Sequence, residues 1–338
     1  MTARKGEKKM IKRRLGRTGY EVSALGLGGY QLTGEFRVPM AEADSIIDYA
    51  LAHGINLIDT AESYGYGEGE AIVGRALARH KGHEPYVCAK VGHLNELISR
   101  RMGDEAYVDY DEIMRCIKHS MWVLRIDHFD LLMYHETERQ WKCRFETGDC
   151  VAQTVLEDLK KEGIAGAIGT SCWDHSVLTK VVKTGRVDAV LSAGGISLLS
   201  KVGVEKLIPA CEEADCGLIV GGCLGQGIPG LIFENREFTK ALIESGVPEK
   251  ADTGNKINAL YDLAKEAGMT MVEMAIRYTL SFEGIHSNVM GARELAHLES
   301  NIASAEKGPL PEDMLKRIDE IQKQGYMIAD HDITAVLM

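Results

Sequence analysis

Short apolar runs and longer amphipathic segments alternate along most of the chain. Runs such as 24–29, 55–58 and 86–90 hold too few residues for a helix, so they predict buried strands. Segments such as 41–53 and 111–125 repeat apolar residues at helical spacing, which predicts helices with one buried face. Regular alternation of strand and helix is typical of a parallel sheet covered by helices.

The full pattern comprises eight strand and helix units with further helices. We expect strands at 24–29, 55–58, 86–90, 129–135, 165–171, 187–192, 216–222 and 288–291. We expect helices at 41–53, 71–79, 111–125, 150–162, 175–184, 204–214, 256–267, 271–280, 296–305 and 312–324. A longer segment rich in glycine and proline, at 225–230 and then at 247–254, interrupts the alternation. The pattern predicts a (β/α)8 TIM barrel with extra helices after the seventh strand and at the C-terminal end.

Two short segments precede the first barrel strand. Residues 12–15 and 20–23 flank a glycine-containing turn and predict a β-hairpin, which a barrel could use as a plug. No linker divides the chain, so we expect a single domain over 11–325. A flexible basic tail at 1–10 and a C-terminal tail at 326–338 would flank it.

Composition argues against several classes of protein. Hydrophobic residues make up 45% of the 338 positions, but no apolar run approaches the roughly 18 residues of a membrane span. A net charge of -11 argues against nucleic acid or an anionic membrane as partner, because both require a basic face. The eight cysteines show no metal-binding spacing, and the N-terminus lacks the apolar core of a signal peptide. We therefore expect a reduced, cytoplasmic protein without a metal.

Polar residues end three consecutive predicted strands. These residues are Asp59, Lys90 and His135, and Tyr64 follows the first of them within one loop. Each has an ordinary structural interpretation: Asp59 as a helix cap beside a packed Tyr64, Lys90 as a surface lysine, His135 as a core histidine. Because the carboxyl ends of barrel strands meet on one face, the joint occurrence favours a catalytic site there.

With these motifs the chain resembles the aldo-keto reductase superfamily. The segment NLIDTAESYG matches that family's aspartate and tyrosine motif, VCAKVG its lysine strand and LLMYHE its histidine strand. The resemblance runs from Lys12 to Asn301 and includes KEGIAGAIGTS, LAKEAGMTMVEMAIRYTL and NVMGARELAHLESN. It implies hydride transfer between a nicotinamide and a carbonyl or alcohol carbon. Tyr64 would be the general acid, Lys90 would lower its pKa, Asp59 would orient Lys90, and His135 would bind the substrate oxygen.

The resemblance also implies a cofactor site, with departures from the family pattern. Ser171 matches a residue that binds the nicotinamide carboxamide, whereas Cys172 replaces the usual asparagine. The usual glutamine of the sixth strand falls on Leu191, Ser192 or Ala193, and Gly221 replaces an aromatic that stacks on the nicotinamide. The expected contacts to pyrophosphate and adenosine phosphate are Leu224, Gly225, Gly227, Gly291, Ala292, Arg293 and Asn301. We expect NADP(H) in preference to NAD(H), although Arg293 could also be a solvated residue at a helix start.

The expected substrate is a small carbonyl compound or alcohol, such as an aldehyde, ketone or sugar. Tyr30, Trp141 and Trp173 would line the pocket. The runs VDAVLSAGGISLL and DYDEI resemble, weakly, the sugar and pyridoxal dehydrogenase branch. Two functions stay open: a working oxidoreductase, or a barrel kept as a cofactor-binding regulatory subunit. The complete tetrad favours the enzyme.

Overall fold

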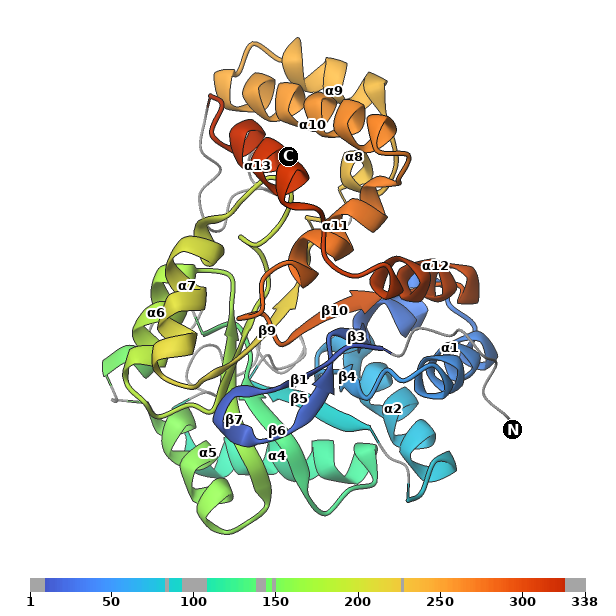
Figure 1. The fold of residues 1–338 in the computed structure, drawn as a ribbon. Coiled ribbons are helices and arrows are strands. Elements are labelled where there is room, and N and C mark those ends of the chain that lie inside the picture. The colour runs from blue at the N-terminus through green and yellow to red at the C-terminus, as the bar shows by residue number, and fades with distance from the viewer. Residues whose placement is uncertain are drawn as a thin grey trace.

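A closed barrel of eight parallel strands forms the centre of the protein (Figure 1). The computed structural model describes residues 10–82, 85–92, 108–137, 144–147, 150–225 and 228–325. The strands follow one another in chain order around the barrel, and the last pairs with the first. They are β3 Leu25–Gly28, β4 Leu57–Asp59, β5 Tyr86–Val91, β6 Phe129–Tyr134, β7 Ala165–Cys172, β8 Ala189–Ser192, β9 Gly217–Gly221 and β10 Ser287–Gly291. The predicted barrel and its eight strands are therefore confirmed.

Helices surround the barrel in Figure 1 and follow the strands in chain order. Several begin where a side chain caps the first turn: Asp109 accepts from the Glu112 N–H, Asp174 from the Ser176 N–H and Thr270 from the Glu273 N–H. The outer helices are α1 Met40–Ala52, α2 Glu68–Arg79, α4 Tyr110–Leu124, α5 Val151–Lys161, α6 His175–Lys183, α7 Val202–Glu213, α11 Met271–Leu280 and α12 Leu295–Glu306. A further helix, α13, covers Glu312–Gln322.

Alternation along the strands separates two apolar layers. Leu57, Leu131 and Met133 belong to a cluster inside the barrel, whereas Ile58 and Leu132 pack in the larger layer that includes the helices. Side chains thus fill the barrel, and polar groups are left to its rim.

The N-terminal hairpin closes the barrel at the end opposite the strand carboxyl termini. Its strands are β1 Lys12–Arg14 and β2 Glu21–Ser23, and Leu15 and Val22 join the interior cluster. Gly16 has a φ of 48°, and a Cβ there would lie 2.3 Å from the backbone nitrogen of Gly217, so only glycine fits. The expected plug is present.

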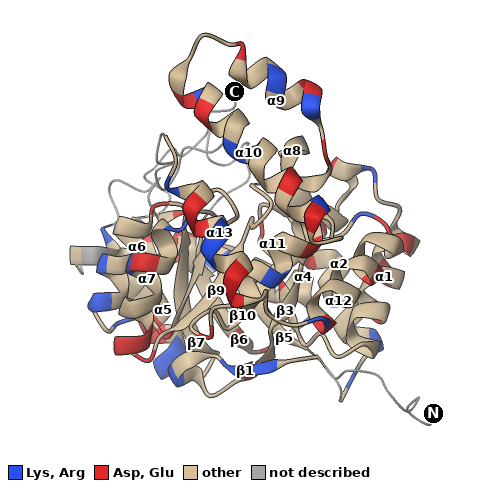
Figure 2. Ribbon diagram, turned by 45° about the horizontal axis from the view of Figure 1, so that its top comes forward, with Lys and Arg blue, Asp and Glu red and all other residues tan. Residues whose placement is uncertain are grey.

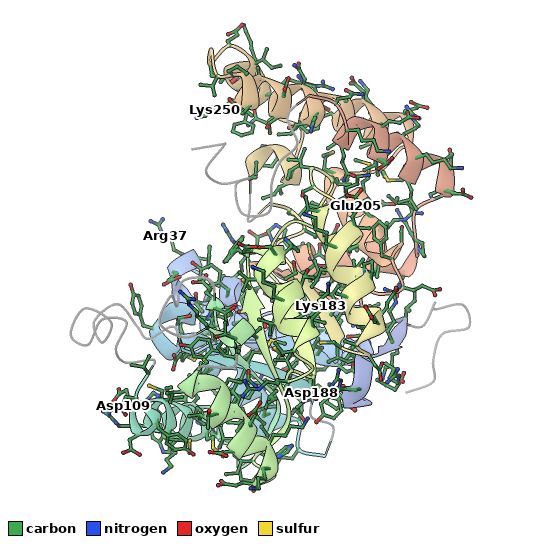
Figure 3. The ribbon with its side chains drawn as sticks, turned by 90° about the vertical axis from the view of Figure 1, so that its left-hand side faces the viewer. Arg37, Asp109, Lys183, Asp188, Glu205 and Lys250 are labelled. Carbon is green, nitrogen blue, oxygen red and sulfur yellow. The ribbon has the colours of Figure 1, made fainter. Side chains whose placement is uncertain are left out.

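A helical insertion follows β9 and rises above the barrel in Figure 1; Figure 3 labels Lys250 on it. It contains α8 Pro229–Ile232, α9 Arg236–Ile243 and α10 Pro248–Glu266. The expectation that 247–254 interrupts the helices is therefore wrong, because α10 begins at Pro248. Proline fits the first turn of a helix, and Gly254 allows close packing of α9 on α10, since a Cβ there would lie 2.8 Å from the Thr239 carbonyl oxygen.

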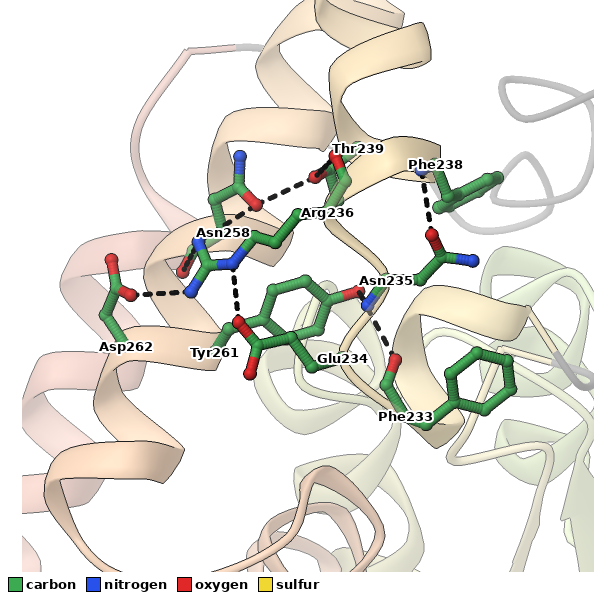
Figure 4. A network of polar contacts seen from close by, with 9 residues as sticks. All are labelled: Phe233, Glu234, Asn235, Arg236, Phe238, Thr239, Asn258, Tyr261 and Asp262. Carbon is green, nitrogen blue, oxygen red and sulfur yellow. Dashed lines mark hydrogen bonds and ion pairs between the residues drawn. The ribbon is translucent and has the colours of Figure 1, made fainter.

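Arg236 fixes the insertion through the network of Figure 4. Its guanidinium donates to Glu234, Asn258 and Asp262 and lies 4.9 Å from the centre of the Tyr261 ring. The Tyr261 hydroxyl accepts from the Asn235 N–H at 3.1 Å. The loop between α8 and α9 is thereby bound to α10.

Several expectations concern the ends of the chain and its surface. Residues 1–9 and 326–338 lie outside the described residues, but Met10, expected in the basic tail, is buried. No described helix is long and apolar enough to cross a membrane. Acidic and basic residues are interspersed over the helices in Figure 2. Cys150 forms a disulfide, so the expectation of fully reduced cysteines does not hold there, whereas free thiols are found at Cys88, Cys116, Cys172, Cys211, Cys216 and Cys223.

Candidate active site

The structure brings Asp59, Tyr64, Lys90 and His135 together at the carboxyl end of the barrel. Asp59 ends β4, Lys90 lies in β5, His135 follows β6, and Tyr64 begins the short helix η4, Tyr64–Gly67. The Lys90 Nζ lies 2.7 Å from Asp59 Oδ1 and donates to the Tyr64 hydroxyl at 2.9 Å. A third bond, to the Thr60 carbonyl oxygen at 3.0 Å, completes the hydrogen bonds of this buried ammonium.

Backbone conformation around Tyr64 aims its side chain at this cluster. Gly65, Tyr66 and Gly67 all have positive φ, at 57°, 56° and 94°, so the chain reverses directly after Tyr64. A Cβ on Gly69 would lie 2.9 Å from the Tyr64 Cβ, so α2 begins in close contact with the tyrosine. The Tyr64 and His135 rings meet edge to face with centroids 5.8 Å apart. A substrate oxygen that contacts both Tyr64 and His135 would therefore meet two side chains of fixed orientation.

Burial is the largest influence on the pKa of Tyr64 and raises it, and the nearby Asp59 carboxylate raises it further. Lys90 lowers the pKa of Tyr64, as the resemblance implies, but its effect is smaller than the other two together. The net pKa lies well above the ordinary tyrosine value, so the expected net lowering is not found. The hydroxyl is held in its protonated form, which is the form that donates a proton.

Burial would lower the pKa of Lys90, but the Asp59 carboxylate and the neighbouring tyrosine outweigh it and raise the pKa. The side chain is 1% exposed, so the ammonium charge is balanced by Asp59 and not by water. Lys90 is therefore held in its charged form in a buried contact with Asp59.

A second carboxyl group, Glu70 on α2, is buried behind the tetrad. It is fully enclosed, and neither of its oxygens has a hydrogen-bond partner among the described residues. Burial raises the pKa of Glu70 to about 8, with a smaller opposing effect from Ser120, although the two side chains do not reach hydrogen-bond geometry. At neutral pH the group is therefore mostly protonated, which avoids an unpaired charge in the core.

This raised pKa predicts a pH-dependent stability. Because the folded-state pKa of Glu70 lies above the ordinary value of 4.5, its favourable contribution is present below about pH 4.5 and is lost as pH rises through about 8. We expect Glu70→Gln to be more stable than the wild type by a few kcal/mol at pH 9, since each tenfold change in an ionisation constant corresponds to about 1.36 kcal/mol. The difference should shrink toward pH 5. Urea unfolding of both proteins at the two pH values measures it, and a pH-independent difference would contradict the assignment.

The residues expected to bind the nicotinamide lie on β7 and β9 and in the segments after them, and β7 pairs directly with β6 of the tetrad. The Ser171 Oγ accepts from the Glu136 N–H at 3.2 Å, which fixes its position near His135. Cys172 is the next residue of β7 and packs in the layer of the helices, so its thiol points away from the side that Ser171 faces. Leu224 and Gly225 follow β9, whereas Gly227 lies outside the described residues.

Three neighbouring strands end in glycine at the rim. Gly221 of β9, Gly291 of β10 and Gly28 of β3 leave this arc of the barrel without side chains of their own. A Cβ on Gly221 would lie 3.6 Å from Val289 Cγ2 and 3.7 Å from Leu191 Cδ2, so it would point into the barrel at ordinary contact distance. At the end of β10 the Gln31 side chain covers the glycine, since a Cβ on Gly291 would lie 2.7 Å from Gln31 Cδ.

Arg293, the expected contact for the adenosine phosphate, lies just before α12. Its guanidinium stacks 4.4 Å from the centre of the Phe36 ring. The first turn of α12 is already engaged, because the Leu295 N–H donates to the Glu42 carboxylate at 2.8 Å. Asn301 is buried on α12, with its amide 3.5 Å from the Gly291 carbonyl oxygen, and Ala292 is buried beside it. Arg293 is therefore an exposed cation that lies close in sequence to this first turn.

The expected pocket residues lie at the same face. The ring of Tyr30 is 45% exposed, contacts Tyr64 with centroids 5.1 Å apart and meets Phe36 edge to face at 4.9 Å. Trp173 follows β7, whereas Trp141 lies outside the described residues. Sequence reasoning missed Phe36, Glu42 and Glu136. Of these three residues, only Glu136 could have been identified as a site residue from the sequence, because it directly follows His135.

Comparisons with known proteins all point to the aldo-keto reductases. The aldo/keto reductase family model matches residues 24–323. Pyridoxal 4-dehydrogenase of Microbacterium luteolum is 26% identical over 322 residues, which cover 86% of this chain and 92% of that protein. L-galactose dehydrogenase of Arabidopsis thaliana is 27% identical over 306 residues, with 86% and 87% covered. An aldo-keto reductase structure from Bacillus halodurans, in its holo form, superposes with a TM-score of 0.74 at 23% identity, over 95% of this chain and 99% of that one.

Proposed function

Because the chain belongs to the aldo/keto reductase family, we propose that it is an NAD(P)(H)-dependent oxidoreductase in which Tyr64 is the general acid and base. The observation that carries the proposal is the position of Lys90, whose Nζ bridges Asp59 and the Tyr64 hydroxyl at 2.7 and 2.9 Å. Packing alone does not require a buried ammonium beside a tyrosine oxygen. Such an ammonium stabilises negative charge on that oxygen.

The roles of the residues follow from this geometry. The bound nicotinamide would supply or accept the hydride, and the glycine arc with Ser171 and Arg293 would hold it. In the reduction direction Tyr64 donates its proton to the substrate oxygen, and His135 orients that oxygen by hydrogen bonding. Lys90 then stabilises the tyrosinate left behind, while Asp59 keeps Lys90 charged and in place. In the oxidation direction the same tyrosine oxygen accepts the proton of the alcohol.

The relatives suggest the class of substrate. Two of them are named for pyridoxal and for L-galactose, and a further relative, 25% identical over 301 residues, is the D-threo-aldose 1-dehydrogenase of a Pseudomonas species. We therefore propose carbonyl compounds and sugars as substrates. A panel of aldehydes, ketones and sugars with each nicotinamide cofactor, read by absorbance near 340 nm, tests the enzyme against the regulatory alternative. Cofactor binding without turnover on any substrate would favour the regulatory subunit.

Replacing Tyr64 by phenylalanine tests the general acid. The variant keeps the ring and its packing but loses the hydroxyl, so we expect turnover to fall about 10²–10⁴-fold while cofactor affinity changes little. Initial rates and cofactor titrations by fluorescence measure the two effects. Phenylalanine at Tyr66, whose side chain is 60% exposed in the same loop, is the matched control and should keep most of the activity. A Tyr64→Phe enzyme with near wild-type rate would remove Tyr64 from the mechanism.

Replacing Arg293 tests the cofactor preference. A charge-assisted contact with the adenosine 2′-phosphate contributes about 1.5–3 kcal/mol, so we expect NADP(H) to bind roughly tenfold or more tightly than NAD(H). Arg293→Ala should remove that preference by weakening NADP(H) alone. Dissociation constants of both cofactors for both proteins decide the matter. Arg37, an exposed arginine beside Phe36 in the sequence and labelled in Figure 3, serves as the control substitution.

Gly221 tests the position proposed for the nicotinamide. If a tyrosine there stacks on the ring, Gly221→Tyr should tighten cofactor binding about threefold to tenfold, in line with an aromatic contact of about 0.5–1.5 kcal/mol. The same side chain would occupy space at the barrel mouth, so activity on large substrates should fall more than activity on small aldehydes. Cofactor titration together with rates on one small and one large carbonyl measures both effects. Unchanged affinity would place the ring elsewhere.

A further inference from the structure

Asn288 is a fully buried polar residue of β10. Its neighbour Val289 belongs to the cluster inside the barrel, so Asn288 points the other way, toward the layer of helices. The Asn288 amide donates to the Thr279 hydroxyl on α11 at 2.9 Å and to the Cys223 sulfur at 3.4 Å. Its Oδ1 has no hydrogen-bond partner among the described residues. A buried amide with an unsatisfied oxygen contributes little to stability, so its two donor bonds require another explanation.

These bonds connect the turn after β9 to the side of β10. Cys223 is 1% exposed and lies in the turn Gly222–Gly225, where the Gly225 N–H donates to the Gly222 carbonyl oxygen at 2.8 Å. Burial raises the pKa of the Cys223 thiol to about 11, so the thiol stays protonated and donates to the Met290 Sδ at 3.2 Å. Through Cys223 the turn therefore contacts two residues of β10.

The composition of the turn makes this attachment important. Gly222 and Gly225 have positive φ, at 69° and 57°, and bring no side chains that could pack. A glycine-rich turn that is not attached has many conformations, and a ligand that requires one of them binds more weakly in proportion to the loss of that conformation. Leu224 and Gly225, the expected contacts of the cofactor pyrophosphate, both belong to this turn.

We propose that Asn288 is a positioning residue for the nicotinamide cofactor, because its amide, through Cys223, holds the turn Gly222–Gly225 in the conformation that receives the pyrophosphate. The proposal rests on the oxidoreductase function proposed above and adds a buried residue that touches neither cofactor nor substrate. Loss of the contact weakens cofactor binding and leaves the reaction of the bound complex unchanged. NADPH and NADH share the pyrophosphate, so both lose affinity by the same factor.

Asn288→Leu separates this role from a structural one. Leucine has a similar volume and removes the unsatisfied oxygen together with the donors, so we expect the melting temperature to stay within a few degrees of the wild type or to rise. We expect the dissociation constants of NADPH and NADH to rise about tenfold each, and kcat at saturating cofactor to stay within about twofold. Fluorescence titration measures the affinities, and initial rates with an aldehyde substrate measure kcat.

Variants of Cys223 test the contact itself. Serine keeps an acceptor for the Asn288 amide, whereas alanine removes it. We therefore expect Cys223→Ser to bind both cofactors within about threefold of the wild type, and Cys223→Ala to lose as much affinity as Asn288→Leu. Because the two residues act through one contact, the double variant with Asn288→Leu and Cys223→Ala should bind no more weakly than either single variant.

Asn258→Ala is the matched control in the helical insertion. The Asn258 side-chain oxygen accepts from the Thr239 hydroxyl at 2.8 Å and from the Arg236 guanidinium at 3.1 Å. Its removal should lower the melting temperature and leave both dissociation constants unchanged.

Alkylation by N-ethylmaleimide gives a second readout of the turn. In Asn288→Leu we expect Cys223 to react about tenfold faster than in the wild type, because the turn opens more often. Saturating NADPH should restore the slow rate, since the bound cofactor favours the closed turn. Peptide mass spectrometry assigns the modified site. Cys211 and Cys216, which are also buried, are the internal controls and should stay unmodified.

Two results overturn the proposal while the cofactor function stands. One is an unchanged dissociation constant for NADPH in Asn288→Leu, and the other is fast alkylation of Cys223 in that variant that NADPH does not slow. Loss of affinity together with a large fall in melting temperature and alkylation of Cys211 and Cys216 would assign a structural role instead. A wild type that binds neither NADPH nor NADH refutes the oxidoreductase function itself.

Discussion

The buried ion pair between Lys90 and Asp59 is the constraint on which the catalytic face depends. An ammonium that is 1% exposed would be strongly unfavourable without its carboxylate, and removing one member of such a pair typically costs about 3–5 kcal/mol. The two residues belong to adjacent strands, so the register of β4 against β5 fixes their separation. Because Lys90 also holds the Tyr64 hydroxyl, strand pairing in the core directly determines the position of the proposed proton donor.

The same site shows that proximity of a positive charge does not by itself set a pKa. Lys90 favours the tyrosinate, but burial and Asp59 act in the opposite direction and keep Tyr64 protonated. A protonated tyrosine suits the donation of a proton to a substrate oxygen. In the proposed mechanism the ion pair would therefore contribute mainly by stabilising the negative charge left on Tyr64 once its proton has moved to the substrate.

Sequence reasoning predicted the barrel well because each strand is a short apolar run that must be buried, and because polar residues end three of them. It missed α9 and the start of α10, since Pro248 and Gly254 signal a loop, whereas the first serves as a helix start and the second as a packing position. It could not predict the stacking of Arg293 on Phe36, which joins distant parts of the chain.

Aromatic contacts link the two ends of the candidate site. Arg293 stacks on Phe36, Phe36 meets Tyr30 edge to face, and Tyr30 contacts Tyr64, with each step no longer than 5.1 Å. Each such contact contributes on the order of 1 kcal/mol, so the chain of contacts is weak enough to rearrange. A phosphate that draws Arg293 toward itself competes with Phe36 for the guanidinium. Phe36 and Tyr30 belong to one short segment after β3, so this segment joins the proposed adenosine end of the site to the proposed substrate end.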